Sequence, residues 1–286
     1  MNLFTKASFL YIINRNIKSV HNNFDMLIFI FFIESGAICD KLIFEFGNLY
    51  QVLMHNFYID KLGKIGDEVL LPTSEAKHLF KTLRAARGDV VGLLDGQGGD
   101  AKAEIIEDKK IIIKNLEHHA EPYIKIHLFV AVPKRAKMDQ LLRQCTEAGV
   151  WAIHPIITKY SVAVPDKISN RWHSLMQEAC KQAGNMFVPK LFTPCPLAKA
   201  MEKIKAAKMS AFYGAVSMDD KKLSYASSPD IAWLVGPEGG FSDEEERQML
   251  SSGVAPLNIG PYIMRVETAA VCGVSLLNFC NKDINF

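Results

Sequence analysis

From residue 124 onward, apolar strand-like segments alternate with helix-like segments, and this alternation restricts the possible folds more than any other feature of the chain. Ile124–Val132 reads IKIHLFVAV, a strongly apolar strand. The next segment, 135–148, spaces its apolar residues as a helix does and ends at Gly149. This order predicts an α/β fold with a mostly parallel sheet covered on both faces, whose ligands bind beyond the carboxyl ends of the strands. Further strands are expected at 152–157, 188–192, 211–216, 231–235 and 256–259, and further helices at 169–183, 197–208, 243–252 and 267–280.

Residues 54–122 follow a different pattern, short strands with one helix, which predicts a small barrel. Thr73 or Ser74 is expected to cap a helix that runs to about Arg84. The stretch DGQGG at 95–99 predicts a tight hairpin, since Asp and Gly tolerate positive φ. It lacks the GxxxxGK[ST] spacing of a phosphate loop, and no helix follows it. The strands are expected at 68–71, 90–94, 101–106 and 110–116.

Residues 1–53 differ from the rest of the chain, because they are rich in Phe, Ile, Leu and Asn without a clear helix or strand period. We interpret them as an atypical extension and a start-site artefact, with Met54 as the true start. Their dense apolar run, Met26–Ile33, is too short to span a bilayer. A secretion signal is the alternative, because Ser35-Gly36-Ala37 resembles a cleavage site, although Asp25 directly precedes the apolar run.

Composition excludes several classes of protein. With 49% hydrophobic and 22% charged residues among 286, the chain is globular rather than disordered. A net charge of +2 means that a nucleic-acid site has to be a local patch. The six cysteines form no CxxC pair and predict free thiols in a reducing cytosol. We therefore predict a cytoplasmic protein that has neither a membrane span nor a metal site.

The first of two unusual loops is GPEGGFS at 236–242, between an apolar strand and a helix. Three glycines and a proline in one turn predict a fixed backbone that a ligand approaches closely. Ser242 and Glu245 have the spacing of a capping box. The first helical turn carries four acids, Asp243 to Glu246, which would repel a phosphate, so a neutral or cationic ligand is expected. The alternative is a plain tight connection without a ligand.

The second loop, IGPYIMRVETA at 259–269, also joins a strand to a helix. Arg265 and Glu267 stand among apolar residues, where a charge is seldom placed without a partner. They could pair with each other, orient a substrate or assist the removal of a proton.

Basic residues crowd the starts of two helices, Lys134, Arg135 and Lys137 at one and Arg171 at the other. Each cation opposes the helix dipole by ~0.3–1 kcal/mol. Bound RNA phosphate would reverse this penalty, and a solvated surface is the alternative. With Arg84 at the end of the barrel helix, these residues form the predicted RNA-binding set.

Together these motifs resemble the RsmE family, the 16S ribosomal RNA uridine N3-methyltransferases of the SPOUT class. The resemblance covers about 54–286, and HNFY at 55–58 is similar to the family's usual start. The two loops in this order are far more specific than a lone GxGxxG. The matching segments are GPEGGFSDEE at 236–245, IGPYIMRVETAA at 259–270, KMDQLLRQCTEAGV at 137–150 and RWHSLMQEACKQAGN at 171–185.

The resemblance implies a PUA-like RNA-binding barrel at 54–122 and a trefoil-knotted SPOUT methyltransferase domain at 123–286. It implies a homodimer that uses S-adenosyl-L-methionine to methylate N3 of a uridine in the 16S rRNA of the 30S subunit, uridine 1498 in the family. Arg265 would stabilise the uracil anion, and Glu267 would position Arg265 or the base, or accept the proton. The implied cofactor-binding residues are Leu234, Gly236, Glu238, Gly239, Gly240, Ile259, Gly260, Met264, Thr268 and Ala269.

The chain departs from the family pattern mainly at arginines. The family commonly has Arg where Tyr262 stands, and Thr where Val266 stands. It has Glu-Gln-x-x-Arg where this chain reads KQAGN at 181–185, and Ser-Glu-Arg where it reads TKYS at 158–161. Either Lys159 and Lys181 substitute for the lost arginines, or the RNA contacts differ, because lysine cannot reproduce a bidentate arginine grip.

Two rival functions follow from these departures. A non-catalytic RNA-binding or ribosome-assembly protein would keep the fold and lose the RNA-gripping arginines. A SPOUT methyltransferase with another RNA target would keep the cofactor loops. The intact loops favour methyl transfer, and the R-x-E-T-A loop together with the barrel favours a uridine.

Overall fold

The computed structural model describes residues 55–107, 109–133, 135–162, 168–215 and 227–281, without the side chains of Ser74 and Arg135. The interpretation of 1–53 as an extension therefore lies outside the described residues. The described part contains two sheets, one formed by the strands up to His118 and the other by the strands from Lys125 onward.

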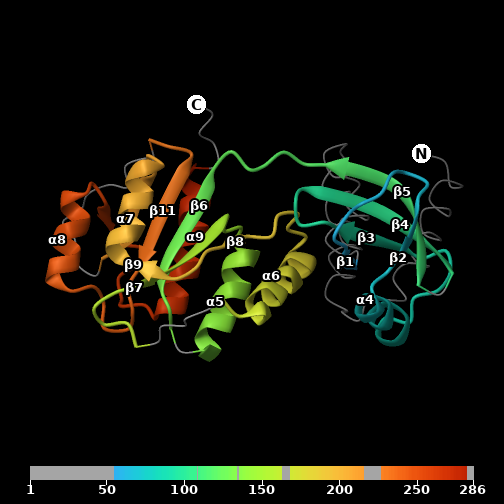
Figure 1. The fold of residues 1–286 in the computed structure, drawn as a ribbon, viewed down its shortest axis with the longest axis horizontal. Helices are drawn as coiled ribbons and strands as arrows, with labels where there is room; N and C mark the ends of the chain where they lie inside the picture. The colour runs from blue at the N-terminus through green and yellow to red at the C-terminus, as the bar shows by residue number, and fades with distance from the viewer. Residues whose placement is uncertain (1–54, 108, 134, 163–167, 216–226, 282–286) are drawn as a thin grey trace, which may run out of the picture. The chain divides into compact units, whose positions relative to one another are not determined.

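The second sheet is parallel throughout, as the alternation of strands and helices predicted (Figure 1). Its strand order is β12-β10-β11-β6-β7-β8, and β9 also pairs with β7. Parallel pairing brings the carboxyl ends of β12, β11, β6 and β7 to one edge, where both unusual loops begin. The strands are β6 (Lys125–Ala131), β7 (Ala152–Ile157), β8 (Lys190–Leu191), β9 (Cys195–Pro196), β10 (Ser210–Gly214), β11 (Asp230–Val235) and β12 (Ala255–Leu257).

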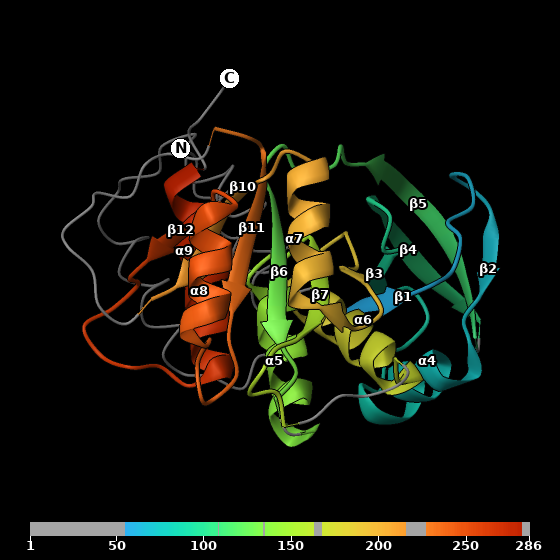
Figure 2. The same cartoon turned by 60° about the vertical axis from the view of Figure 1, so that its left-hand side comes forward.

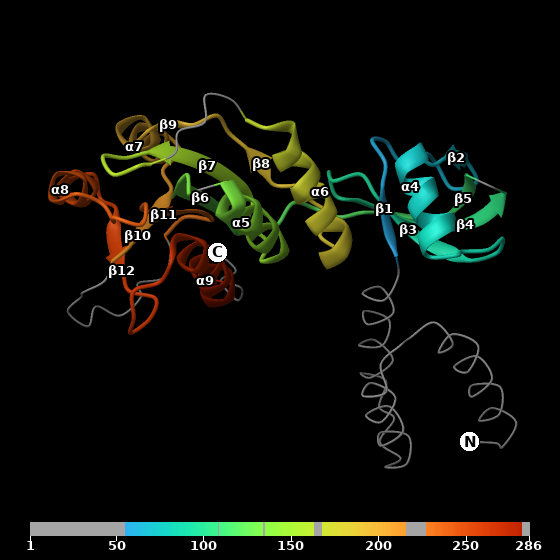
Figure 3. The same ribbon diagram turned by 90° about the horizontal axis from the view of Figure 1, so that it is seen from below.

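Helices cover both faces of this sheet, α5, α6 and α9 on one face and α7 and α8 on the other (Figure 3). Successive residues of a strand point to opposite faces of the sheet. Trp233 of β11 packs with α9, whereas Leu234 packs in the core of α7 and α8. The helices are α5 (Arg135–Glu147), α6 (Asn170–Ala183), α7 (Leu197–Ala206), α8 (Asp243–Ser251) and α9 (Val266–Asn281).

The first sheet has the strand order β1-β3-β4-β5-β2 and encloses a core of its own (Figure 2). β3 and β4 form the predicted hairpin, in which Gly96 and Gly98 have φ of 72° and 97°. The carboxylate of Asp95 accepts the N–H groups of Gln97 and Gly99, each at 2.8 Å. The strands are β1 (Asn56–Tyr58), β2 (Glu68–Leu70), β3 (Val90–Leu94), β4 (Gly99–Glu107) and β5 (Lys110–His118).

The helix of the first sheet differs from the prediction. It begins at Thr73, so that Thr73 and Ser74 are its first residues rather than its cap, and α4 ends at Lys77. A π-helical turn, η1 (His78–Thr82), continues it, and Arg84 follows with a left-handed φ of 55°. The N–H of Leu83 donates to the carbonyl of His78, five residues earlier, which leaves the helix ending before Arg84.

The hairpin glycines have a second role, close contact with the segment that follows α6. The N–H of Gly98 donates to the carbonyl of Met186 at 3.0 Å, and the N–H of Val188 donates to the carbonyl of Gly96 at 3.0 Å. A β-carbon on Gly98 would lie 2.8 Å from the ring of Phe187. The DGQGG stretch therefore forms the hairpin turn and also binds the segment that follows α6.

Three further features bear on the class of protein. Among the described helices, none is long and apolar enough to cross a bilayer. Within the same residues, no cluster of three or more His, Cys, Asp or Glu side chains has the geometry to hold a metal ion. The five described cysteines are free thiols, and burial raises the pKa of Cys180 to about 12. The trefoil knot implied by the resemblance stays a prediction.

Candidate functional site at the carboxyl edge of the parallel sheet

The first loop folds tightly after β11. Ser242 caps α8, and the capping box with Glu245 is formed as predicted. Gly240 has a left-handed φ of 72°, and a β-carbon on Gly236 would lie 3.2 Å from the carbonyl carbon of Gly240. Residues 238–240 are exposed, so the backbone of this turn is open to a ligand.

The second loop is anchored by Trp233 of β11, the strand that leads into the first loop. The indole N–H of Trp233 donates to the carbonyl of Ala269 at 3.2 Å, at the start of α9. Gly273, one turn further along α9, packs directly on the same indole, leaving no room there for a β-carbon. This contact holds the beginning of α9 against β11 and places the second loop beside the first.

Lys137 joins the two loops. Its Nζ lies 3.1 Å from Oε1 of Glu238 in the first loop and 3.8 Å from Oε2 of Glu267 in the second. Glu267 is buried, with 7% of its surface exposed, and its Oε2 has no hydrogen-bond partner within the described structure. The Lys137 ammonium is therefore the nearest neutralising charge for this carboxylate.

Arg265 and Glu267, whose direct pairing was one of the open alternatives, do not contact each other. Within the described residues, the guanidinium of Arg265 makes no hydrogen bond or ion pair, and the residue is exposed. Glu267 instead turns inward toward Lys137. Arg265 is thus accessible to a substrate, whereas Glu267 is held inside the protein.

The remaining predicted cofactor residues differ in their accessibility. Leu234 is fully buried in the core of α7 and α8. Thr268 is exposed, and Ile259, Gly260, Met264 and Ala269 are partly exposed. A β-carbon on Gly260 would lie 2.6 Å from the end of the Met264 side chain, so the loop is folded back on itself at this point.

The predicted RNA-binding residues are dispersed. Arg84 is exposed and follows the helix of the first sheet, whereas Lys137 lies between the two loops of the second sheet. Arg171 pairs with Asp139 of α5, with Nε and Nη2 each 2.9 Å from Oδ2, while half of its side chain stays exposed. Lys134 and the side chain of Arg135 lie outside the described residues.

Lys181 is unsuited to replace a lost arginine. Its Nζ lies 2.8 Å from Glu75 and 2.8 Å from Glu178, and 13% of its side chain is exposed. Burial lowers the pKa of Lys181, but the hydrogen bonds that its ammonium donates to Glu178 and Glu75 outweigh this effect and raise the pKa above the usual value. This lysine holds α6 to α4 rather than a ligand.

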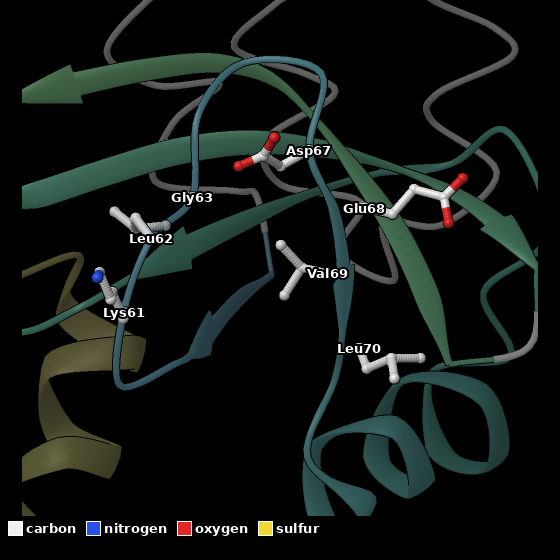
Figure 4. A pocket seen from close by; sticks show the side chains of 7 residues that line it. All are labelled: Lys61, Leu62, Gly63, Asp67, Glu68, Val69 and Leu70. Atoms are coloured by element: carbon white, nitrogen blue, oxygen red, sulfur yellow. The ribbon is translucent and has the colours of Figure 1, made fainter.

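A shallow hollow elsewhere belongs to the first sheet and is lined by the segment around β2 (Figure 4). Its charged members, Lys61, Asp67 and Glu68, point away from one another. Asp67 accepts the N–H of Lys64 at 2.7 Å, as a turn residue does. The hollow contains no residue of either loop.

Sequence reasoning missed the link made by Lys137, because its partners lie more than 100 residues away in the chain and no local pattern joins them. It also missed the role of Glu245 in binding the turn after β7. Oε1 of Glu245 accepts the N–H of Lys159 at 2.8 Å while Oε2 serves the capping box.

Comparisons with known proteins agree with this architecture. The RNA methyltransferase domain family matches residues 119–278, and the RNA methyltransferase PUA domain matches residues 71–117. Ribosomal RNA small subunit methyltransferase E of Aquifex aeolicus is 29% identical over 233 residues, which cover 78% of this chain and 99% of that protein. The protein of the same name from Synechocystis is 26% identical over 219 residues, covering 73% and 72%.

A solved structure is similar as well. It is a ribosomal RNA small subunit methyltransferase E from Neisseria gonorrhoeae bound to S-adenosyl methionine, with a TM-score of 0.71 and 25% identity, and the match covers 79% of this chain and 98% of that one. The strand-end loops, the preceding PUA domain and a family match over more than half of the chain lead to one conclusion: the chain belongs to the RNA methyltransferase family.

Proposed function

We propose that this protein transfers a methyl group from S-adenosyl-L-methionine to N3 of a uridine in the 16S rRNA of the small ribosomal subunit. The observation that carries the proposal is the pair of loops at one sheet edge, GPEGG and R-x-E-T-A, joined by Lys137. The relatives named small subunit methyltransferase E support ribosomal RNA as the substrate class.

The residues of the two loops fit S-adenosyl-L-methionine. Its sulfonium is cationic and it carries no phosphate, which suits an edge with the four acids Asp243 to Glu246. The open backbone at 238–240 leaves room for close approach. We assign cofactor binding to Gly236, Glu238, Gly239, Gly240, Ile259, Gly260, Met264, Thr268 and Ala269, with Leu234 supporting them from the core.

When bound, the cofactor supplies an electrophilic methyl group, so this chain's own residues mainly orient the uridine and stabilise charge. The N3–H of uridine has to lose its proton at or before attack, which leaves negative charge on the uracil ring. Arg265, exposed and without a protein partner among the described residues, is suited to stabilise that charge. Glu267 is buried and faces Lys137, which favours a positioning role over proton transfer.

We assign RNA binding to Arg84 and Arg171, which are exposed, and to Lys134 and Arg135, which the sequence places where α5 begins. Arg171 keeps half of its side chain exposed while Asp139 fixes its position, which suits a phosphate contact. Lys137, predicted as a member of this set, contacts two carboxylates, and these contacts favour a role inside the site.

A homodimer is supported by α9. This helix is apolar almost all round, and such helices are normally buried. One of its faces is nevertheless open, with Phe279 78% exposed and Cys272 and Leu276 partly exposed on the same side. A second copy of the chain would cover this face. Light scattering of the purified protein should give twice the mass of one chain, and a monomer mass would contradict the assignment.

The test of the function is methyl transfer by the purified full chain, with labelled S-adenosyl-L-methionine and either naked 16S rRNA or 30S subunits lacking the modification. We expect label in 3-methyluridine. Whichever of the two RNAs is methylated faster is the form in which the protein recognises its substrate. A cytoplasmic location follows from a ribosomal substrate. Cofactor binding without transfer to either RNA would favour a non-catalytic RNA-binding protein instead.

A further inference from the structure

A tight turn follows β7 at the same sheet edge. The N–H of Thr158 donates to Oγ of Ser161 at 2.9 Å, and the N–H of Ser161 donates to the carbonyl of Thr158 at 3.1 Å. The two hydroxyl oxygens are 3.0 Å apart. These bonds fix the backbone of the two residues between them, Lys159 and Tyr160.

The turn is also fastened to the first loop. Glu245 accepts the N–H of Lys159 at 2.8 Å with one carboxylate oxygen and the N–H of Ser242 at 2.8 Å with the other. A β-carbon on Gly239 would lie 3.3 Å from the β-carbon of Tyr160 and 3.7 Å from the edge of its ring. Tyr160 therefore stands directly against the glycine turn assigned to the cofactor.

The ring of Tyr160 is not part of the core. The residue is 46% exposed, and Nζ of Lys159 lies 5.8 Å from the centre of the ring. Single exposed aromatic residues are ordinary on protein surfaces. An exposed ring on a fixed backbone, beside a cation and against Gly239 of the first loop, is instead an arrangement that suits unpaired RNA, in which a base stacks on the ring and a phosphate meets the cation.

We propose that Tyr160 is a stacking platform for a nucleobase of the RNA substrate and that Lys159 binds an adjacent phosphate. The inference rests on the proposed function and adds to it how this chain holds RNA. The turn stands where the family has Ser-Glu-Arg, and the other candidate substitute, Lys181, is already paired with Glu75 and Glu178. In this chain, base stacking takes the place of the hydrogen bonds that arginine would make. Stacking is available to every base, because each base has a flat aromatic face whatever its hydrogen-bonding edge.

The test compares Tyr160→Ala and Tyr160→Phe in the full chain. Filter binding to 30S subunits lacking the modification, without cofactor, measures RNA affinity directly, and calorimetry measures S-adenosyl-L-methionine affinity. Tyr160→Ala should weaken 30S binding roughly 5- to 150-fold, the range for loss of one stacked base. Tyr160→Phe keeps the ring and should bind as the wild type does. Neither change should alter cofactor affinity.

Tyr123→Ala is the matched control, because Tyr123 is 55% exposed but precedes β6, at the opposite edge of the sheet. Equal 30S binding by wild type and Tyr160→Ala would overturn the inference. So would an equal loss in Tyr123→Ala, or a loss confined to cofactor affinity. If the wild type transfers no methyl group but its 30S binding depends on Tyr160, the proposed reaction fails while this inference stands.

Discussion

The ammonium of Lys137 in helix α5 lies 3.8 Å from the buried carboxylate of Glu267 in the second loop. The same ammonium reaches Glu238 of the first loop at 3.1 Å. The ammonium of Lys137 thus connects helix α5, the first loop and the second loop. The side chain of Glu267 is 9% exposed and that of Glu238 is 42% exposed, so the contact with Lys137 is shielded from water only on the Glu267 side.

Replacing Lys137 with Met should destabilise the protein by about 1–3 kcal/mol, the cost of leaving a buried charged acceptor without a partner. Adding Glu267→Gln removes that charge, so the double variant should be more stable than Lys137→Met alone. Urea unfolding of the wild type, both single variants and the double variant gives the coupling free energy. Strictly additive losses would mean that the two side chains do not interact.

Arg265→Ala should lower the turnover number by roughly 10²–10³-fold while the cofactor still binds, as for loss of one charge-stabilising donor. The exposure of Arg265 makes a large loss of folding stability unexpected. Single-turnover methyl transfer measures the rate, and calorimetry measures cofactor affinity. Wild-type turnover in this variant would remove Arg265 from the mechanism.

Gly239→Val should abolish binding of S-adenosyl-L-methionine, because a side chain would fill the open face of the first loop. A β-carbon there already approaches Tyr160 at 3.3 Å. The double variant Gly239→Val, Tyr160→Ala relieves that contact and should still fail to bind the cofactor in calorimetry. Recovery of binding in the double variant would show that displacement of Tyr160, and not obstruction of the loop, caused the defect.

His154 should make stability depend on pH. It is stacked between Phe129 and Phe192, with ring centres 4.3 and 4.2 Å away. Burial first, and then the neighbouring His127 and Lys203, lower the pKa of His154 to about 3.

An unfolded histidine titrates near pH 6.5, so the unfolded chain takes up the proton first when the pH falls. The stability contributed by neutral His154 is complete above about pH 6.5 and is lost toward pH 3, by up to about 1.4 kcal/mol per pH unit. His154→Phe keeps the stack without a titrating group, so its unfolding free energy should fall less between pH 7 and pH 5. Identical pH slopes for both proteins would contradict this.

Much of the parallel sheet could be predicted from sequence, because its strands and helices carry strong local signals. β7 occupies the predicted 152–157, and Gly149 and Gly184 end α5 and α6 with left-handed backbones. β1 and β9 were missed, because strands of three and two residues have no period of their own and exist through pairing with β3 and β7. The barrel helix was predicted too long, because apolar spacing does not reveal the extra residue of a π turn.

The two loops were identifiable because glycine, proline and charge are unusual in their setting. The contacts that connect these loops to the rest of the site could not be predicted. Lys137 meets Glu238, and Lys159 meets Glu245, only because the folded sheet brings segments that are far apart in the chain to the same edge. For the same reason the sequence left Arg265 and Glu267 as a candidate pair, whereas the fold separates an outward guanidinium from an inward carboxylate.

The identity of the methylated nucleoside decides whether this protein is a uridine N3-methyltransferase. The purified full chain, S-adenosyl-L-methionine labelled at its methyl group and 30S subunits lacking the modification would be combined, and the digested RNA analysed by mass spectrometry. We expect labelled 3-methyluridine with the wild type and a strongly reduced amount with Arg265→Ala. Label in any other nucleoside, or no label although the cofactor binds, would overturn the proposed function.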